Sequence, residues 1–299
     1  MKKNVAVLMA TYNSERYMRI QIDSILAQKD VNVCLLVRDD GSTDGTVDIL
    51  RDYASRGELK YYTGKNLKSA RCFMQLLFDA PDADYYAFSD HDDFWQEDKL
   101  ITAVNALNAS GEKPALYLSQ PQATDADFNL LPCKQFNPQG GFGESMVYWF
   151  AMGCTMLFNK NLREIINSYQ PDFLYMHDVW IYSIAYAVDA DVIWDPVPHT
   201  LNRQHGGNVV GLDANALSML KLRIERFLNG KEVRYRQALE LKKGFSKYIP
   251  DTNAQILDRF INAKRHFHLR VSLLFDNHYR CSDNLTQYLF WVNLIFNKY

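Results

Sequence analysis

Short apolar runs and segments of helical spacing alternate along the first hundred residues, and this alternation constrains the fold more than any other feature. The apolar runs lie at 5–9, 33–37, 59–62 and 85–88, and their lengths are typical of buried strands. Helical spacing fills the segments between them, at 14–28, 44–54 and 68–78. Strands and helices that alternate in this way form a mainly parallel sheet with helices on both faces. We therefore expect an α/β fold.

The pattern becomes mixed after a predicted helix at 97–109 and is wholly helical near the end. Short strands are expected around 115–119, 154–158 and 191–194, a glycine-rich loop at 137–145, and a helix that begins near His177. From Asp213 onward, basic residues occupy the polar positions of helical segments. We place a boundary near Gly211, which divides the chain into an α/β domain (1–211) and a C-terminal helical region (212–299).

Charge is distributed unevenly between these two parts. The net charge of the chain is −2, but residues 1–212 carry 18 basic and 27 acidic side chains, a net of −9, whereas residues 213–299 carry 15 and 8, a net of +7. The C-terminal part therefore has a different electrostatic character. With 47% hydrophobic and 13% aromatic residues, the chain can bury a sizeable core. We predict no nucleic-acid partner.

The cysteines and the N-terminus indicate a cytoplasmic protein. The five cysteines are scattered singly, without the close pairs of zinc sites or redox motifs, and we expect reduced thiols: Cys34, Cys72, Cys133, Cys154 and Cys281. The first apolar run is too short for a signal peptide and predicts a strand instead. No stretch approaches the roughly 20 apolar residues that span a bilayer. Any membrane contact should be peripheral.

Polar clusters follow the first, second and fourth predicted strands: "ATYNS", "RDDGSTDGT" and "SDHDDFW". Parallel sheets bind ligands beyond the carboxyl ends of their strands, so we expect these clusters to meet at one edge. In the second cluster, Gly41 predicts a turn and residues 42–44 predict a helix cap. Asp39 and Asp40 need another explanation. Their carboxylates can accept hydrogen bonds from a nucleobase or from ribose hydroxyls.

The third cluster places Asp90, Asp92 and Asp93 within four positions, directly after a predicted buried strand. Crowded carboxylates repel one another, so such a loop is either well solvated or holds a cation. Asp90 and Asp92 flank one residue, and this spacing lets both carboxylates reach one hard cation while phosphates and water complete its shell. Mg²⁺ or Mn²⁺ suits such oxygen ligands.

Together, "ATYNSERYMRIQIDSILAQ", "RDDGSTDGT" and "SDHDDFW" carry a resemblance, in this order and spacing. The first 210 residues resemble the family 2 glycosyltransferases with a GT-A fold, in particular the bacterial rhamnosyltransferase-like members that build surface polysaccharides. The C-terminal helices match these enzymes only in general character. The resemblance implies an inverting transferase with a GT-A (Rossmann-like) sheet that uses a nucleotide-diphosphate sugar as donor.

Site residues follow from the same resemblance. It implies that Asp39 or Asp40 lies near the base and ribose of the donor, and that Asp90-His91-Asp92 is the metal-binding DXD motif. It also implies donor contacts from three residues of the first cluster: Thr11, Tyr12 and Asn13. The preferred donor would be deoxythymidine-diphosphate rhamnose, followed by UDP-hexoses.

A general base on the acceptor side is expected in "YMHDVWIY". This segment resembles the acidic base motif of the family, an acidic pair or a His-Asp pair before aromatic residues, and its spacing from the DXD motif fits, so Asp178 is our candidate base. The alternative is that Asp178 only caps the helix that follows, and both roles can coexist.

A flap is predicted in "NRQHGGNVVG", where Arg203 and His205 precede two glycines. A glycine hinge beside basic side chains suits a segment that closes over a diphosphate. Arg203 is our candidate for the donor phosphates, and His205 would complete the metal shell as in some related enzymes. The Gln-x-x-Arg-Trp motif and membrane helices of processive synthases are missing, so we expect one sugar per encounter.

The sequence therefore predicts a glycosyltransferase that acts on a glycan or a lipid-linked saccharide. Two alternatives stay open: a nucleotide-sugar-binding module without turnover, and a Mg²⁺-dependent nucleotidyltransferase or phosphohydrolase. The basic C-terminal helices and the aromatic end "LTQYLFWVNLIFNKY" predict packing, a homo-oligomer contact, or peripheral contact with the inner face of the cell membrane through residues 213–299.

Overall fold

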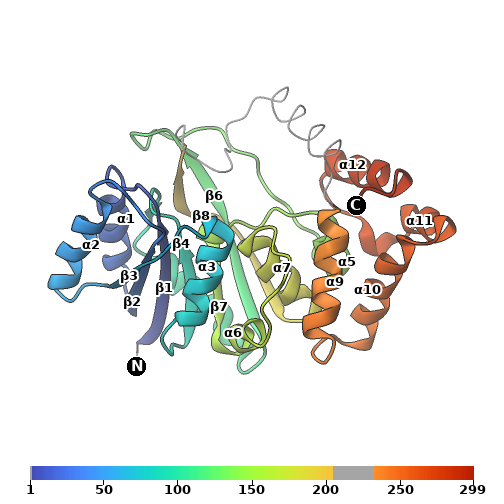
Figure 1. Ribbon diagram of the computed structural model, residues 1–299, viewed down its shortest axis with the longest axis horizontal. Coiled ribbons are helices and arrows are strands. Elements are labelled where there is room, and N and C mark those ends of the chain that lie inside the picture. The colour runs from blue at the N-terminus through green and yellow to red at the C-terminus, as the bar shows by residue number, and fades with distance from the viewer. Residues whose placement is uncertain (1, 205–231) are drawn as a thin grey trace.

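One mixed sheet of eight strands runs through the molecule (Figure 1). The structure is a computed structural model that describes residues 2–204 and 232–299. The strand order is β3-β2-β1-β4-β7-β6-β8-β5. Four neighbouring pairs are parallel and three are antiparallel, which confirms the mainly parallel α/β sheet. The strands are β1 (Lys3–Thr11), β2 (Val31–Asp39), β3 (Lys60–Thr63), β4 (Tyr85–Ser89), β5 (Phe94–Trp95), β6 (Ala115–Thr124), β7 (Leu157–Asn159) and β8 (Asp191–Arg203).

Helices cover both faces of this sheet, because successive residues of a buried strand point to opposite sides. Along β1, Val5 and Val7 belong to one hydrophobic cluster, with α1, α2 and α4. Ala6 and Leu8 belong to the other, with α3, α6 and α7. The helices in this part of the chain are α1 (Met18–Leu26), α2 (Thr46–Ser55), α3 (Lys68–Asp79), α4 (Lys99–Leu107), α5 (Phe142–Val147), α6 (Lys160–Asn167) and α7 (His177–Ala187).

Four elements in the mixed region have bounds that differ from the predicted ones. The strand expected at 115–119 continues as β6 to Thr124. The glycine-rich loop ends early, because α5 begins at Phe142. The strand expected at 154–158 is shorter, since a 3-10 turn, η2 (Gly153–Thr155), precedes β7. The strand expected at 191–194 continues as β8 to Arg203, paired with β6 across a register shift near Pro121. This longer strand carries Arg203 to the edge of the sheet where the polar clusters lie.

Strand register brings the polar clusters together. Thr11, the last residue of β1, pairs with Asp39, the last residue of β2, and Met9 pairs with Ser89 at the end of β4. The three strands therefore end at the same edge, as a parallel arrangement requires. The expected convergence of "ATYNS", "RDDGSTDGT" and "SDHDDFW" is confirmed.

The helices after residue 232 pack against the α/β part through a shared core. Ala238 and Phe245 of α9 lie in the same hydrophobic cluster as Trp180 of α7 and the sheet residue Leu8, and the Trp180 and Phe245 ring centroids are 5.7 Å apart. These helices are α9 (Val233–Phe245), α10 (Asp251–Ala263), α11 (Phe267–Leu274) and α12 (Asn284–Ile295), with a 3-10 turn η3 (Asn277–Tyr279). They form the end of the molecule opposite β3 (Figure 1).

The predicted boundary near Gly211 lies outside the described residues, so the division into two parts stays a prediction. The described residues on its two sides share one continuous core. All five cysteines are free. Among the described helices, none combines the length and the apolar character needed to cross a membrane.

Candidate active site

The loops after β1 and β2 are joined by reciprocal hydrogen bonds. The Asn13 N–H donates to Ser42 Oγ (2.8 Å), and the Thr43 N–H donates to Asn13 Oδ1 (2.9 Å). Asn13 has a φ of 51°, a left-handed conformation that asparagine tolerates better than most residues. Thr11 Oγ1 donates to Asp39 Oδ1 (3.3 Å). These two predicted donor-binding segments therefore form one unit, from which Tyr12 projects with 48% of its surface exposed.

Asp39 and Asp40 both serve the local fold. Asp39 is buried and accepts hydrogen bonds from the backbone of Gly41 (3.2 Å) and Ser42 (3.1 Å), as well as from the Ser42 hydroxyl. It thereby holds the turn that follows β2.

Asp40 is the acidic partner of a buried ion pair. It is paired with Arg38, and both side chains are 5% exposed. Its carboxylate also accepts from the backbone N–H groups of Leu67 (2.8 Å) and Lys68 (3.0 Å) at the start of α3, where the helix leaves donors unsatisfied. These contacts explain Asp40 without a ligand, and a donor contact of Asp39 or Asp40 stays a prediction.

The third cluster is a dense group of carboxylates at the end of β4. Asp90 is partly exposed, Asp92 is 8% exposed and Asp93 is completely buried. Burial, followed by the charges of Asp92 and Asp178, raises the pKa of Asp90 to about 7. Burial and the charges of Asp92 and Asp90 also raise the pKa of Asp93 well above its usual range. Each carboxylate thus disfavours ionisation of the next one, as expected for crowded acids.

Asp93 connects this cluster to β8. Its Oδ1 accepts from Asn202 Nδ2 (2.9 Å) and from the Arg203 N–H (3.3 Å). In the described residues, its Oδ2 accepts from no N–H or hydroxyl group, and the Cys154 thiol is its polar neighbour. Oxygens of Asp90 and Asp93 and the Cys154 sulfur lie within 4.8 Å of one another. This set contains neither Asp92 nor His205, and His205 lies outside the described residues.

Two cations lie against the carboxylates. Arg203 is buried between aromatic rings, with its Cζ 4.0 Å from the Phe128 ring centroid and 4.5 Å from that of Tyr17, and it interacts electrostatically with Asp92 and Asp93.

Lys99 is the second cation, at the start of α4. It is 1% exposed, its Nζ lies 4.4 Å from the Trp95 ring centroid, and it has an electrostatic interaction with Asp93. Burial lowers its pKa to about 8, which still leaves it mostly cationic at neutral pH. The protein therefore compensates part of the acidic charge by itself.

Asp178 lies near Asp90, in the first turn of α7. The predicted capping role is wrong in detail, because Met176 is the N-cap residue of this helix. Asp178 Oδ1 instead accepts from the Val179 N–H (2.7 Å), and Oδ2 accepts from the Gly153 N–H of η2 (3.3 Å). A carboxylate is favourable at a helix N-terminus. Its charge reaches Asp90, so Asp178 belongs to the same site.

His177 explains how α7 presents Asp178. The imidazole is buried, stacks on Phe73 at a centroid distance of 4.1 Å and meets Phe88 of β4 edge-on at 5.0 Å. Burial lowers its pKa, so the ring is neutral at neutral pH. A Cβ at Gly153 would lie 2.5 Å from His177 Nε2, so glycine is required there. With His177 packed inward, the next residue, Asp178, faces the carboxylates.

The structure therefore brings Asp90, Asp92, Asp178 and Arg203 together, next to the joined loops that carry Thr11, Tyr12, Asn13 and Asp39. Asp93, Lys99 and Cys154 also belong to this site and were not predicted. Asp93 lies inside the quoted "SDHDDFW" motif. Its position directly before two aromatic residues was the sequence feature that could have indicated a buried acid. Lys99 and Cys154 gave no signal, because their proximity depends on the tertiary fold.

Comparisons with known proteins identify the class. Residues 6–177, more than half of the chain, match the model of glycosyl transferase family 2. Together with the mainly parallel sheet and its edge of carboxylates, this match defines a glycosyltransferase with a GT-A fold. The chain belongs to glycosyl transferase family 2.

Individual relatives and solved structures agree with this assignment. The chain is 30% identical to the dTDP-rhamnosyl transferase RfbG of Shigella flexneri over 225 residues, which cover 68% of this chain and 73% of that protein. It is 35% identical to the putative teichuronic acid biosynthesis glycosyltransferase TuaG of Bacillus subtilis over 101 residues, which cover 33% and 40%. The crystal structure of S. aureus TarS 1–349 with UDP-GlcNAc superposes with a TM-score of 0.61 at 18% identity, covering 98% of this chain and 79% of that one. At this identity the likeness shows the fold alone.

The structural role of Asp40 leads to a stability prediction. Asp40→Ala should lower the free energy of unfolding by roughly 3–5 kcal/mol, because it leaves the buried Arg38 charge unpaired and removes the acceptor at the start of α3. The control is Asp52→Ala, whose carboxylate is 48% exposed and pairs with Arg19 and Arg56 on the surface. That change should cost about 0–1 kcal/mol. Urea unfolding of the three proteins measures both, and equal losses would contradict the structural role of Asp40.

Proposed function

We propose that this glycosyltransferase moves a single sugar from a nucleotide-diphosphate sugar to a hydroxyl of a glycan or lipid-linked saccharide, with inversion at the anomeric carbon. The observation that carries the proposal is the position of Asp178. Its carboxylate stands beside Asp90 at the carboxyl edge of the sheet, on a different element from the loops that carry Thr11, Asn13 and Asp39. One side of the carboxylate cluster is thus available to a donor and the other to an acceptor.

The donor is a nucleotide-diphosphate sugar in this proposal. TarS was solved with UDP-GlcNAc, and RfbG is named a dTDP-rhamnosyl transferase. We place the nucleoside against Thr11, Tyr12, Asn13 and the turn at Asp39, where the exposed Tyr12 and Asn13 offer an aromatic ring and hydrogen-bonding groups. Deoxythymidine-diphosphate rhamnose is our first candidate, followed by UDP-hexoses.

The residues at the end of β4 fit a hard divalent cation. Crowded carboxylates, two of them with raised pKa values, are the oxygen ligands that Mg²⁺ or Mn²⁺ prefers. Asp90 and Asp92 would hold the cation, with His205 in its shell. Burial and the charges of Asp93 and Asp90 raise the pKa of Cys154 well above its usual range, so it stays a thiol and is a poor ligand for such ions. A bound cation would supply charge stabilisation for the departing diphosphate.

The residues of the chain have separate tasks in the transfer. Asp178 takes the proton from the acceptor hydroxyl as that oxygen attacks C1 of the sugar, and the bond from C1 to the diphosphate oxygen breaks on the opposite face. Arg203, fixed between Tyr17 and Phe128, adds positive charge near the leaving diphosphate. Asp93 is completely buried and connects the β4 loop to β8 through its contacts with Asn202 and Arg203. Lys99 is buried as well and interacts electrostatically with Asp93.

The two alternative functions differ from this proposal in testable ways. A binding module would retain a nucleotide sugar without forming product, and a nucleotidyltransferase or phosphohydrolase would cleave or form a phosphate bond rather than a glycosidic one. Family membership favours transfer. A screen of nucleotide sugars for release of the nucleoside diphosphate, with Mn²⁺ present, separates the three reactions by their products.

Surface-polysaccharide synthesis at the inner face of the cell membrane is the setting we propose. It is supported by the relatives named for rhamnosyl transfer and teichuronic acid biosynthesis and by five free cysteines, which are typical of a reducing compartment.

The proposal of membrane contact is supported by α11 and α12 rather than by α9. On α9, Lys242 and Lys243 are paired with Asp258 and Asp172, and the basic residues at 221, 223, 226 and 231 lie outside the described residues. The apolar surface of α11–α12 instead presents side chains that are 36–74% exposed: Phe267, Val271, Phe275, Leu285, Tyr288, Ile295 and Phe296. Their spacing forms one stripe on each helix, and Arg265, His266 and His268 are exposed beside Phe267.

Metal dependence is the first test. We expect EDTA to abolish nucleotide-sugar turnover and Mn²⁺ or Mg²⁺ to restore it, because unneutralised carboxylates repel the diphosphate. Asp92→Ala should remove most activity with an unchanged unfolding profile, whereas Asp48→Ala, an exposed acid on α2, should keep full activity. Nucleoside-diphosphate release is the measurement. Full turnover in EDTA would exclude the cation.

Asp178→Asn tests the base, because it keeps the shape of the side chain and an acceptor for one of the two backbone N–H groups of Val179 and Gly153 but cannot take a proton. Transfer should fall by a factor on the order of 10²–10⁴ while donor binding persists. The control is Asp189→Asn, just beyond the other end of α7 and 72% exposed on its side chain. If Asp178→Asn transfers sugar at the wild-type rate, the base is another residue.

Co-sedimentation with vesicles tests the membrane contact. The protein should bind phosphatidylglycerol vesicles at low salt and dissociate from them as salt rises. It should not bind neutral phosphatidylcholine vesicles. Replacing both Phe275 and Phe296 by serine should weaken binding, because these rings are 74% and 65% exposed. Protein that stays in the supernatant with anionic vesicles at low salt would assign this surface to a homo-oligomer contact, which light scattering would detect.

A further inference from the structure

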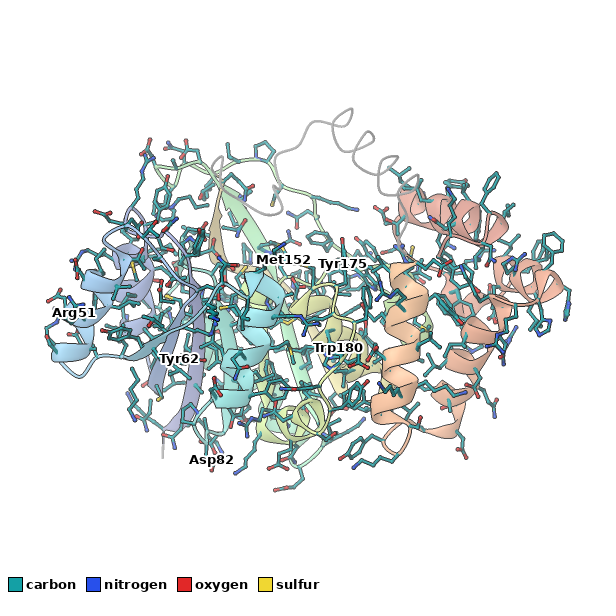
Figure 2. All side chains as sticks on the ribbon, viewed as in Figure 1. Arg51, Tyr62, Asp82, Met152, Tyr175 and Trp180 are labelled. Atoms are coloured by element: carbon teal, nitrogen blue, oxygen red, sulfur yellow. The ribbon has the colours of Figure 1, made fainter. Side chains whose placement is uncertain are left out.

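Two aromatic residues near Asp178 belong to neither hydrophobic core. Trp149 and Tyr175 come from separate segments, and their ring centroids are 5.5 Å apart with an interplanar angle of 36°. Both are partly exposed, and neither is a member of the two core clusters or packs against them. Tyr175 and Met152 lie toward the edge of the molecule at which the central strands end (Figure 2). The pair therefore needs an explanation other than core packing.

Both segments adjoin the proposed base. The Gly153 N–H donates to Asp178 Oδ2 (3.3 Å), so the segment that follows Trp149 reaches that carboxylate four residues later. Tyr175 precedes Asp178 by three residues, just before the N-cap Met176. Both segments belong to the side of β4 on which β7 and α7 lie, whereas the loops after β1 and β2 lie on the other side. Trp149 and Tyr175 are thus on the acceptor side of the site.

Helix α9 contacts the segments that carry both aromatic residues. The Arg234 guanidinium lies over Trp149, with Cζ 4.6 Å from the ring centroid, and its NH2 donates to the Val147 carbonyl (3.0 Å). Trp149 Nε1 donates to the Ser145 carbonyl (2.9 Å).

The loop before Tyr175 is held by the same helix. Glu240 accepts from the N–H groups of Asp172 (3.1 Å) and Phe173 (3.3 Å) and from the Tyr169 hydroxyl (2.7 Å). Arg236 lies over the Phe173 ring, at 3.9 Å from its centroid. The loop that leads to Tyr175 is therefore held by contacts that do not involve a ligand, which reduces the entropy lost when a ligand stacks on the tyrosine.

We infer that Tyr175, backed by Trp149 and Arg234, is a stacking subsite for the sugar ring of the acceptor. This inference rests on the proposed transferase function. A pyranose has apolar C–H groups on its face, which pack on the electron-rich face of an aromatic ring, while its hydroxyls stay at the rim. A ring stacked on Tyr175 presents one of these hydroxyls to Asp178. In this arrangement, Trp149 and Arg234 are positioning residues, and the C-terminal helices contribute to acceptor binding through α9.

The test measures release of the nucleoside diphosphate from the accepted donor, with and without added saccharide. The probes are the methyl glycosides of glucose, galactose, mannose, N-acetylglucosamine and rhamnose. In the wild-type protein, at least one of them should stimulate release above hydrolysis by water. Tyr175→Leu should raise the KM for that glycoside roughly tenfold, the size expected for one lost aromatic contact, with a much smaller effect on the KM for the donor.

Two further variants make the result specific. Tyr175→Phe keeps the ring and should retain the wild-type KM for the glycoside. Tyr248→Leu alters a similarly half-buried tyrosine just after the far end of α9, stacked by Lys247, and should leave both KM values unchanged. Circular dichroism melting confirms that each variant is folded.

The outcomes separate this inference from the proposed function. If Tyr175→Leu and Tyr248→Leu respond to the glycoside equally, or if no glycoside stimulates the wild-type protein, the subsite is overturned while donor hydrolysis still supports the transferase. If no nucleotide sugar is consumed under any condition, the proposed function falls, and the subsite falls with it.

Discussion

The repulsion among carboxylates at the end of β4 is the constraint on which the rest of the site depends. Asp90, Asp92 and Asp93 interact with one another, and Asp90 also interacts with Asp178, in surroundings where burial already opposes ionisation. Such a group is stable only if positive charge and hydrogen-bond donors surround it. The neighbouring elements supply them: α4 provides Lys99, and β8 provides Asn202, the Arg203 N–H and the Arg203 guanidinium.

This compensation covers only part of the negative charge, and it acts on the inner carboxylate more than on the outer ones. Asp93 is completely buried and accepts hydrogen bonds from Asn202 and the Arg203 N–H, whereas Asp90 is partly exposed. Remaining negative charge therefore faces the open edge of the sheet, where a cation and a diphosphate would meet it. Buried contacts hold the inner acids in place, and the outer ones stay available for chemistry. The loops after β1 and β2 show a similar division between inner and outer residues. Asp40 is paired with Arg38 inside the protein, and Tyr12 projects outward.

The C-terminal helices pack against the elements that carry this site. Helix α9 shares the core of α7 through Phe245 and Trp180, and its Gln237 donates to Ser183 Oγ (2.6 Å). Glu240 holds the loop that leads to α7. The helix that carries Asp178 is thus packed between the sheet and the C-terminal region. A region that the sequence predicts as a separate helical part thus contributes to the support of the proposed base.

Much of the α/β part was predictable because its signals are local. Apolar runs separated by helical spacing indicated β1 to β4 and α1 to α3, and parallel strands necessarily end at one edge, so the convergence of Thr11, Asp39 and Asp90 followed from chain order alone. The bounds of β7, α5 and β8 did not follow. Their ends depend on pairing with distant strands and on η2 packing against His177, which a local pattern does not encode.

The sequence by itself determined which residue types reach the site: three acids after β4, an acid after His177, and polar loops after β1 and β2. Only the tertiary structure decided their roles. It buried Asp93 and left Asp90 partly exposed, paired Asp40 with Arg38, and brought Lys99, Cys154 and the Trp149–Tyr175 pair to the same edge. The physical reason is that burial, electrostatic coupling and stacking depend on distances between residues far apart in the chain, and those distances exist only in the folded protein.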